Sequence, residues 1–259
     1  MRGKEHTDHA AILRPYLPRL TIEWLAAHPD ETWREIDGTL AFVDVSGFTA
    51  LSERLARRGK VGAEELSETI GACFEQLLAV AYGLGGSLIK FGGDALLLLF
   101  RGPEHATRAG AAAVGMRSTL RSVGNIVTPA GRVKLRMSVG VHTGTFHFFL
   151  VGDDHRELLV TGPAATRTTL MEQTADAGEI VVSGETAACL PAGCLGAAKG
   201  EGTLLRAAPD VAEAPIDPMA DQGFDPTPGI PAAIREHLLA GGGEPEHRQA
   251  GVMFMRFQG

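Results

Sequence analysis

Two aspartates stand where their carboxylates could bind a metal ion and, through it, a phosphate. Asp44 lies near the end of the apolar run LAFVDV, and Asp94 follows Gly92 and Gly93 between two further apolar runs. If the first run is a strand that pairs antiparallel with the third, the two carboxylates lie side by side. Adjacent carboxylates repel one another, so the pair predicts a site for Mg²⁺ or a similar cation. The alternative is that both are turn residues that face water.

The residues that follow Asp44 are suited to a phosphate group. The stretch DVSGFTALSERL runs from the predicted strand through a glycine-containing turn into a predicted helix. The first amides of a helix lie at the positive end of its dipole, and Gly47 lacks the Cβ that would obstruct a close approach. The turn is therefore a predicted phosphate site, although Ser46 or Thr49 would also suit an ordinary helix N-cap.

The spacing of apolar residues predicts the elements that position these groups. Helices are expected where Leu66, Ile70, Phe74, Leu77 and Leu78 recur at helical spacing, over the alanine-rich residues 104–122, and over 163–174. Strands are expected at TLAFVDV, SLIKF, ALLLLF, VKLRMSVGVH, FHFFLV, ELLVT and EIVVS. The order is β-α-β-β-α-β with additions, which predicts an α+β fold with a ferredoxin-like sheet.

The composition excludes several classes of protein. The 259 residues are 44% hydrophobic and 21% charged, as in a soluble globular chain. The formal net charge is −7 and the basic residues are scattered, which argues against a nucleic-acid polymer or a membrane surface as partner. No apolar run reaches the length of a signal sequence or a membrane span, so a soluble cytoplasmic protein is predicted.

The cysteines and histidines do not suggest a metal site. Cys73, Cys189 and Cys194 are odd in number and lack metal-ligand spacing, which predicts free thiols. His142, His147 and His155 are close in sequence, but strand alternation would put the first two on opposite faces, which argues against zinc.

Over roughly residues 38–205 the chain resembles the class III adenylyl and guanylyl cyclases. The resemblance is carried by FVDVSGFTALSERL, GGSLIKFGGDALLLLF, RMSVGVHTG and LLVTGPAATRTTLMEQTADAGEIVVS. Within the family the chain is similar to the first catalytic half of tandem cyclases of the mammalian soluble, bicarbonate-responsive kind and their actinobacterial relatives. The resemblance implies a palm-like sheet and the conversion of ATP to cyclic AMP and pyrophosphate with two Mg²⁺ or Mn²⁺ ions.

The resemblance also implies roles for individual residues. Asp44 and Asp94 would bind both metal ions, assisted by the backbone carbonyl of Val45. The amides of Gly47, Phe48 and Thr49 would contact the phosphates, and Arg136 in KLRMSVG would contact the triphosphate. The alternative for Arg136 is a surface charge on an edge strand.

A second set of family residues is missing. Active sites of the family form between two catalytic domains, and the second domain supplies a base-reading residue and an Asn/Arg pair for the transition state. At the Asp, Asn and Arg positions this chain carries Leu159, Thr166 and Leu170. A leucine cannot donate a hydrogen bond to adenine or to developing negative charge. The resemblance therefore implies a metal-binding half that needs a second cyclase domain.

Lys90 matches a lysine that contacts adenine in an active partner domain. In the first halves of bicarbonate-responsive cyclases the corresponding lysine lies in a regulatory anion pocket. The arginine that accompanies it there is Thr169 in this chain, so bicarbonate regulation is not expected. The alternative is a strand lysine whose aliphatic stem covers the sheet.

Changes in composition divide the chain. Residues 1–37 are predicted to form a helical arm around Leu20, Trp24 and Leu25, and residues 38–206 form the cyclase domain. Residues 207–245 are rich in Ala, Pro, Asp and Gly and are predicted as a linker with a short helix. Residues 246–259 are predicted to begin a second cyclase domain, in which Arg256 replaces the metal-binding aspartate; the alternative is an extra strand on the first sheet.

Two other functions fit parts of the sequence. A diguanylate cyclase shares the palm-like sheet and a GGDEF hairpin, but GGDALLLLF lacks the acidic residue after Asp94. A noncatalytic pseudo-cyclase would bind nucleotide, or only dimerise, and regulate an attached domain. The sequence does not choose between ATP and GTP, because the base-reading residues would lie on the partner.

Overall fold

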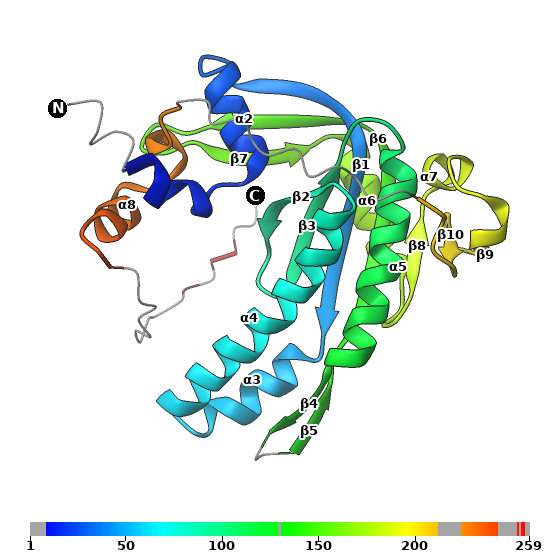
Figure 1. Ribbon diagram of the computed structural model, residues 1–259. Coiled ribbons are helices and arrows are strands. Elements are labelled where there is room, and N and C mark those ends of the chain that lie inside the picture. The colour runs from blue at the N-terminus through cyan, green and yellow to red at the C-terminus, as the bar shows by residue number, and fades with distance from the viewer. Residues whose placement is uncertain (1–8, 129–130, 212–223, 243–252, 254, 257–259) are drawn as a thin grey trace.

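The computed structural model shows a mainly antiparallel sheet with helices on both faces (Figure 1). It describes residues 9–128, 131–211, 224–242, 253, 255 and 256. The strand order is β2-β3-β1-β6-β8-β10-β9, and β7 also pairs with β6. The strands are β1 (Trp33–Ser46), β2 (Gly86–Phe91), β3 (Ala95–Phe100), β6 (Arg136–Val151), β7 (Glu157–Thr161), β8 (Ile180–Val182), β9 (Leu195–Lys199) and β10 (Gly202–Leu205).

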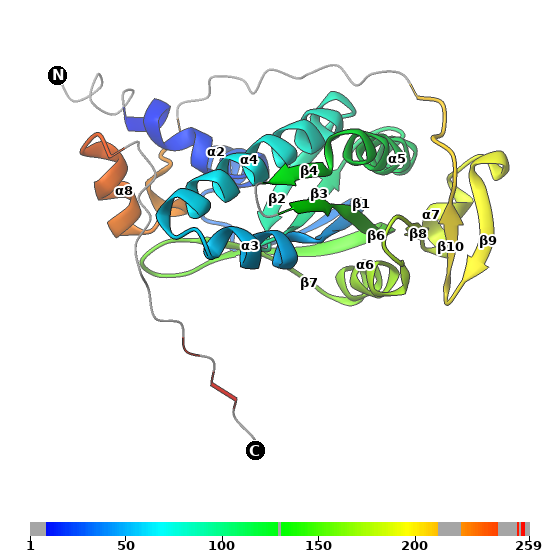
Figure 2. The ribbon, with the colours of Figure 1, turned by 90° about the horizontal axis from the view of Figure 1, so that it is seen from below.

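One face of the sheet is covered by α4 (Lys60–Gly83) and α5 (His105–Val123), and α3 (Phe48–Ala56) packs beside α4 (Figure 2). From β1, Ala41, Val43 and Val45 point into this layer and are fully buried. On α5 the small side chains of Ala109 and Ala112 are also fully buried, which lets the helix lie close to the sheet. Since alternate residues of a strand face opposite sides, Asp44 points toward the other face.

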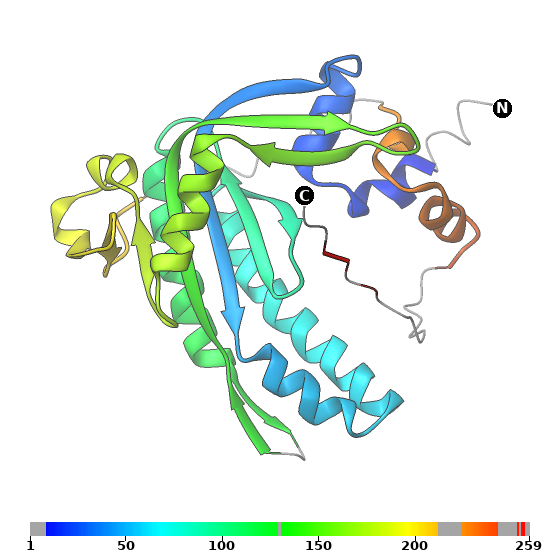
Figure 3. The same cartoon turned by 180° about the vertical axis from the view of Figure 1, so that it is seen from behind.

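That other face carries α6 (Pro163–Thr174), which packs against β6 (Figures 2 and 3). Gly140 of β6 makes this contact close: a Cβ there would lie 2.1 Å from the amide nitrogen of Glu172 and 2.5 Å from the carbonyl oxygen of Thr168. Any larger residue would push the helix away from the sheet. The depth at which α6 sits is therefore set by one glycine.

Several predicted elements are confirmed. The first strand pairs antiparallel with β3, with Asp44 opposite Ala95, and β2 and β3 form the expected hairpin around Gly92-Gly93. The α6 helix has the bounds predicted from the sequence. The arm helix α2 (Arg19–Ala27) buries Leu20, Trp24 and Leu25 in a cluster with Phe146 and Phe148.

The prediction of two strands at VKLRMSVGVH and FHFFLV is wrong. Apart from Val133, Lys134 and Leu135, these residues belong to one strand, β6, that continues through Thr143, Gly144 and Thr145. All of β1, from Trp33 to Ser46, pairs with β6, so backbone pairing carries the strand across a stretch that looks like a turn in isolation. Before β6, a separate hairpin is formed by β4 (Asn125–Thr128) and β5 (Gly131–Lys134).

Part of the predicted linker packs on the arm. Residues 224–242 contain the expected short helix, α8 (Ala232–Leu239), but Ile230 is buried in a cluster with Leu13, Leu17 and Ile22 of the arm. The amide of Arg156, in the β6–β7 loop, donates to the carbonyl oxygen of Pro228. Figure 3 shows this segment beside α2 and the far ends of β1, β6 and β7. The segment is therefore held to the arm by apolar contacts around Ile230.

The C-terminal tail, residues 246–259, is described in part. Of residues 246–259, Met253, Met255 and Arg256 are described; they are exposed and outside helices and strands, and the rest of the predicted second-domain strand lies outside the described residues. All three cysteines are free, and burial raises the pKa of the Cys73 thiol. In the part of the chain that is described, no helix combines the length and apolarity needed to cross a membrane.

Candidate functional site

The structure brings Asp44 and Asp94 together at one end of the sheet. The amide of Val45 donates to the carbonyl oxygen of Asp94 over 3.1 Å, which fixes the two aspartates next to each other. Burial raises the pKa of Asp44, and the negative charge of Asp94 raises it further. The pair therefore has a free-energy cost when both carboxylates are ionised and no cation is present.

The predicted phosphate turn lies directly after Asp44 and Val45. Gly47 has φ of 104°, in the left-handed region, and a Cβ there would lie 3.1 Å from the carbonyl oxygen of Lys134. It is the N-cap of α3, and the hydroxyl of Ser46 donates to the carbonyl oxygen of Arg136 over 3.4 Å, so a cap by Ser46 is not observed; the side chain of Thr49 lies outside what the structure describes. Since α3 begins at Phe48, its first amides have no partner within the helix and are free for an anion.

Arg136 lies across from this turn. It is the first residue of β6 and is opposite Ser46 in the register of β1 and β6. It is exposed and precedes Val139–Val141, the residues of β6 that pair with β8, so a triphosphate contact and a surface charge both stay predictions for Arg136. The guanidinium thus belongs to the same end of the sheet as the aspartates and the turn.

Two further polar residues adjoin Asp44 and were not found from the sequence. Ser138 is opposite Asp44 on β6, and its hydroxyl donates to Oε1 of Glu172 on α6 over 2.8 Å. Burial raises the pKa of Glu172; the hydrogen bond from Ser138 opposes this, and the charge of Asp44 adds to it. A third carboxylate therefore contributes negative potential at Asp44. It is there because Gly140 admits α6 so close to the sheet.

These residues fit a divalent cation that is shared with a phosphate ligand. Among the described residues, no three His, Cys, Asp or Glu side chains form a group able to hold a metal ion by themselves. Mg²⁺ does not need such a group, because it is usually held by one or two carboxylates together with substrate phosphates and water. Asp44 and Asp94 beside the start of α3 supply that arrangement.

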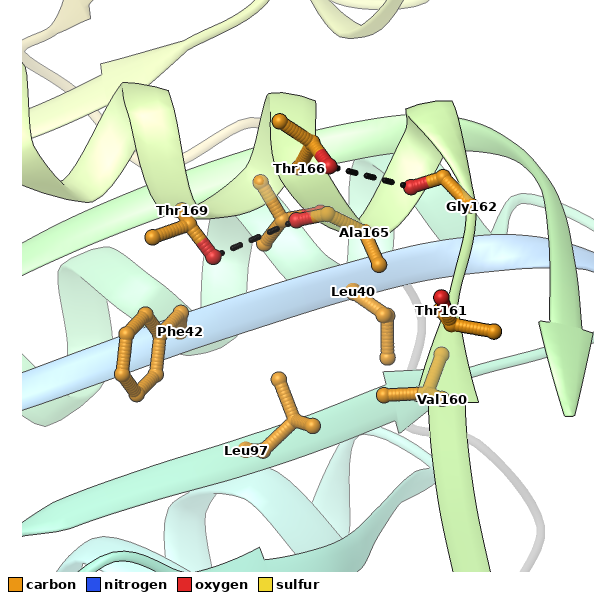
Figure 4. A pocket seen from close by; sticks show the side chains of 10 residues that line it. Leu40, Phe42, Leu97, Val160, Thr161, Gly162, Ala165, Thr166 and Thr169 are labelled. Atoms are coloured by element: carbon orange, nitrogen blue, oxygen red, sulfur yellow. Dashed lines mark hydrogen bonds between the residues drawn. The ribbon is translucent and has the colours of Figure 1, made fainter. Parts of the chain in front are cut away.

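A pocket of about 280 Å³ lies between α6 and the sheet and has no charged residue in its lining (Figure 4). The hydroxyl groups that α6 contributes are turned back on that helix: Thr166 donates to the carbonyl of Gly162, and Thr169 to that of Ala165, both over 3.3 Å. Of the other two positions where the family places polar groups, Leu159 is 42% exposed and Leu170 is half-buried. Among the described residues that line the pocket, none offers a cation or a carboxylate to a ligand.

Lys90 is not in the lining of that pocket. Its ammonium forms an ion pair with Glu157 of β7, and both side chains are about half exposed. The lysine thus links the β2–β3 hairpin to β7. This ion pair accounts for Lys90 without a bound anion.

A buried hydrogen bond joins β6 to the residue that follows β8. His142 is 6% exposed, and its Nδ1 lies 2.8 Å from the Ser183 hydroxyl. Burial lowers the pKa of His142; Glu185, 3.6 Å away, opposes this, and Arg167 adds to it. His147, in contrast, is half-buried, with its Nε2 3.4 Å from Glu35.

We expect His142 to make stability depend on pH. Because its folded-state pKa lies below the unfolded value of about 6.5, the unfolded chain binds more protons, and stability falls as pH decreases from about 6.5 toward the folded-state pKa. Urea unfolding of wild type and H142N at pH 7.5, 6.5 and 5.5 should show a smaller loss in the variant. H147N should follow the wild type. Parallel losses in wild type and H142N would contradict this role.

Comparison with known proteins shows which family this architecture represents. The family model described as the adenylate and guanylate cyclase catalytic domain matches residues 34–204. The chain belongs to this family. The resemblance inferred from the motifs is thereby confirmed, and so is the α+β fold class. The matched region is a cyclase catalytic domain.

Three relatives give the range of similarity. Human adenylate cyclase type 10 is 30% identical over 152 residues, which are 57% of this chain and 9% of that protein. The guanylyl cyclase Cya2 has 25% identity and a TM-score of 0.54 over 68% of this chain and 93% of its own. The adenylyl cyclase CyaB from P. aeruginosa shares the fold, with 21% identity and a TM-score of 0.55 over 70% and 100% of the chains. This chain spans about a tenth of the length of the curated adenylate cyclases it matches.

Proposed function

We propose that this chain contains the metal- and triphosphate-binding half of an adenylyl cyclase, which makes cyclic AMP from ATP together with a second cyclase domain. The observation that carries the proposal is the pairing of Asp44 and Asp94 next to the start of α3. Cyclase domains of this family bind nucleotides, use divalent cations and often pair with another cyclase domain. ATP is proposed because human adenylate cyclase type 10, with 30% identity over 152 residues, is named an adenylate cyclase.

Each residue of the half-site has a defined part in the proposed reaction. Mg²⁺ or Mn²⁺ ions, two in number, would supply the charge that lowers the pKa of the attacking 3′-hydroxyl and stabilises the leaving pyrophosphate. Asp44 and Asp94, with the Val45 carbonyl, would hold these ions. The amides of Gly47, Phe48 and Thr49 would orient the phosphates, since the helix N-terminus favours negative charge.

The other half of the site is proposed to come from a partner domain. In the transition state, negative charge develops on the phosphate oxygens, and preorganised donors stabilise it. Thr166 bonds to its own helix, and Leu159 and Leu170 have no donor. The partner, in the same or another chain, would therefore supply the base-reading residue and the Asn/Arg pair.

Calorimetric titration of the chain with ATP, with and without Mn²⁺, tests the proposal. Binding that requires Mn²⁺ is expected. Absence of binding in both conditions would refute the metal and triphosphate site. Binding without turnover, even with an active second domain present, would instead indicate a pseudo-cyclase.

Arg136 should contribute to the binding of the triphosphate. Charge-assisted hydrogen bonds are typically worth about 1.5–3 kcal/mol, so R136A is expected to weaken ATP binding by about tenfold or more. Adenosine has no phosphate, and its affinity should change little. Equal losses for ATP and adenosine would place Arg136 outside the phosphate site.

A further inference from the structure

A second cavity, of about 490 Å³, lies beyond the phosphate turn and is lined by four cationic side chains. Arg117 and Arg121 come from the last turns of α5, Lys134 ends β5, and Arg136 begins β6. The remaining walls are apolar or backbone, apart from Glu179. Three separate elements thus direct positive charge into one hollow of a chain whose formal net charge is −7. We call it the basic pocket.

The positive charge of the basic pocket is not balanced within the described part of the chain. The one carboxylate in its lining, Glu179, is already paired with Lys199, and hydrogen bonds from Lys199 lower its pKa. Among the described residues, Arg121, Lys134 and Arg136 have exposed side chains and form no ion pair. An anion entering the pocket would therefore find cations that have no competing carboxylate.

Arg117, which is half-buried, also lies beside another cation, Arg121. Its guanidinium donates to the carbonyl oxygens of Leu205, over 3.3 Å, and Arg206, over 3.0 Å, which fixes its position. Burial lowers its pKa, and the positive charge of Arg121 lowers it further. The negative end of the helix dipole explains why Arg121 suits the last turn of α5. It does not explain why Lys134 and Arg136 line the same cavity.

The ligand class follows from the shape and the charge. Guanidinium groups match pairs of phosphate oxygens. Four cationic side chains in one pocket are more than a ligand with a single carboxylate would need. A concave pocket of this size does not fit a polymer backbone or a lipid surface. It adjoins the phosphate turn, because the Lys134 carbonyl lies against Gly47 and Arg136 is opposite Ser46.

We propose that the basic pocket is an anion site for a diphosphate group, separate from the metal-binding aspartates. It would bind that group without a metal ion, through Arg121 and Lys134 with support from Arg117 and Arg136. The group has two sources: a free small molecule, or the diphosphate end of a nucleotide held at the neighbouring turn. The proposal goes beyond the proposed function, because metal-free binding does not need Asp44.

Calorimetry with inorganic pyrophosphate in EDTA tests the proposal. Wild type and D44N should bind pyrophosphate equally, whereas R121Q and K134Q should each lose about tenfold or more. R57Q removes the same charge from an exposed residue outside the pocket and should bind as wild type does. Circular dichroism melting of each variant checks folding, and the two pocket variants serve as independent tests.

The outcomes separate this proposal from the proposed function. No metal-free pyrophosphate binding, or equal losses in R57Q and R121Q, would overturn the pocket even if Mn²⁺-dependent ATP binding is intact. Pyrophosphate binding that persists with Mn²⁺ and a nonhydrolysable ATP analogue bound identifies a free diphosphate as the ligand. Competition between the two assigns the pocket to the diphosphate end of the nucleotide, provided that R121Q weakens the analogue as well.

Discussion

Assayed alone with ATP and Mn²⁺, the 259-residue chain should make essentially no cyclic AMP. A homodimer would place Asp44 and Asp94 of one copy opposite Leu159, Thr166 and Leu170 of the other. The loss of one preorganised donor commonly costs about 10²–10³ in rate. Here two donors are absent together with the base-reading residue, although such losses do not simply add.

Activity should appear when the missing groups are supplied. A cyclase domain that carries the family's Asp, Asn and Arg, added in trans or fused, should restore turnover, and D94N should abolish it. The same groups can be placed in this chain as L159D, T166N and L170R, since Leu159 and Thr166 are exposed and Leu170 is half-buried. A chain that carries this triple substitution together with D94N, mixed with the unmodified chain, should form one complete site per dimer. Robust turnover by the unmodified chain, lost in D94N, would contradict the half-site.

The second large effect concerns the aspartate pair. D44N and D94N should each abolish Mn²⁺-dependent ATP binding, measured by calorimetry, because one carboxylate cannot replace two in holding the metal ions. D153N, in the exposed β6–β7 loop, removes the same charge and should bind ATP as wild type does. Unchanged affinity in D44N at saturating Mn²⁺ would rule out the site.

The D94N substitution should stabilise the metal-free protein. The folded-state pKa of Asp44 is raised by burial and by Asp94, so the folded chain holds this proton more tightly than the unfolded chain does. Stability is thus lost as pH rises through the raised pKa. D94N removes the repulsion, and its melting temperature in EDTA at pH 7 should exceed that of wild type. The difference should shrink at pH values where Asp44 is protonated.

The sequence predicted the aspartate pair from one local signal and one rule of the fold. A Gly-Gly turn defines the β2–β3 hairpin, and the rule that the first and third strands of this fold pair antiparallel brings Asp94 to Asp44. Likewise α6 begins at Pro163 after Gly162, so its start could be predicted. Local signals of this kind depend on the identity of a few adjacent residues.

The rest of the site depends on packing between distant segments. Glu172 adjoins Asp44 because Gly140, on another element, admits α6 closely. The basic pocket forms where the end of α5 meets the start of β6. Neither Arg121 nor Lys134 lies in a sequence motif that would predict this meeting. Periodicity shows which face of a helix is apolar, but not how deeply the helix sits or which charges it brings to a neighbouring loop.

The packing of Ile230 on the arm has a practical meaning for protein production. The composition suggests ending a recombinant cyclase domain near residue 206, where the Ala- and Pro-rich stretch begins. Ending it there would remove the cover from Leu13, Leu17 and Ile22, and exposed apolar clusters of this kind promote self-association. An expressed domain should therefore extend through residue 242, so that aggregation is not mistaken for an intrinsic property of the catalytic fold.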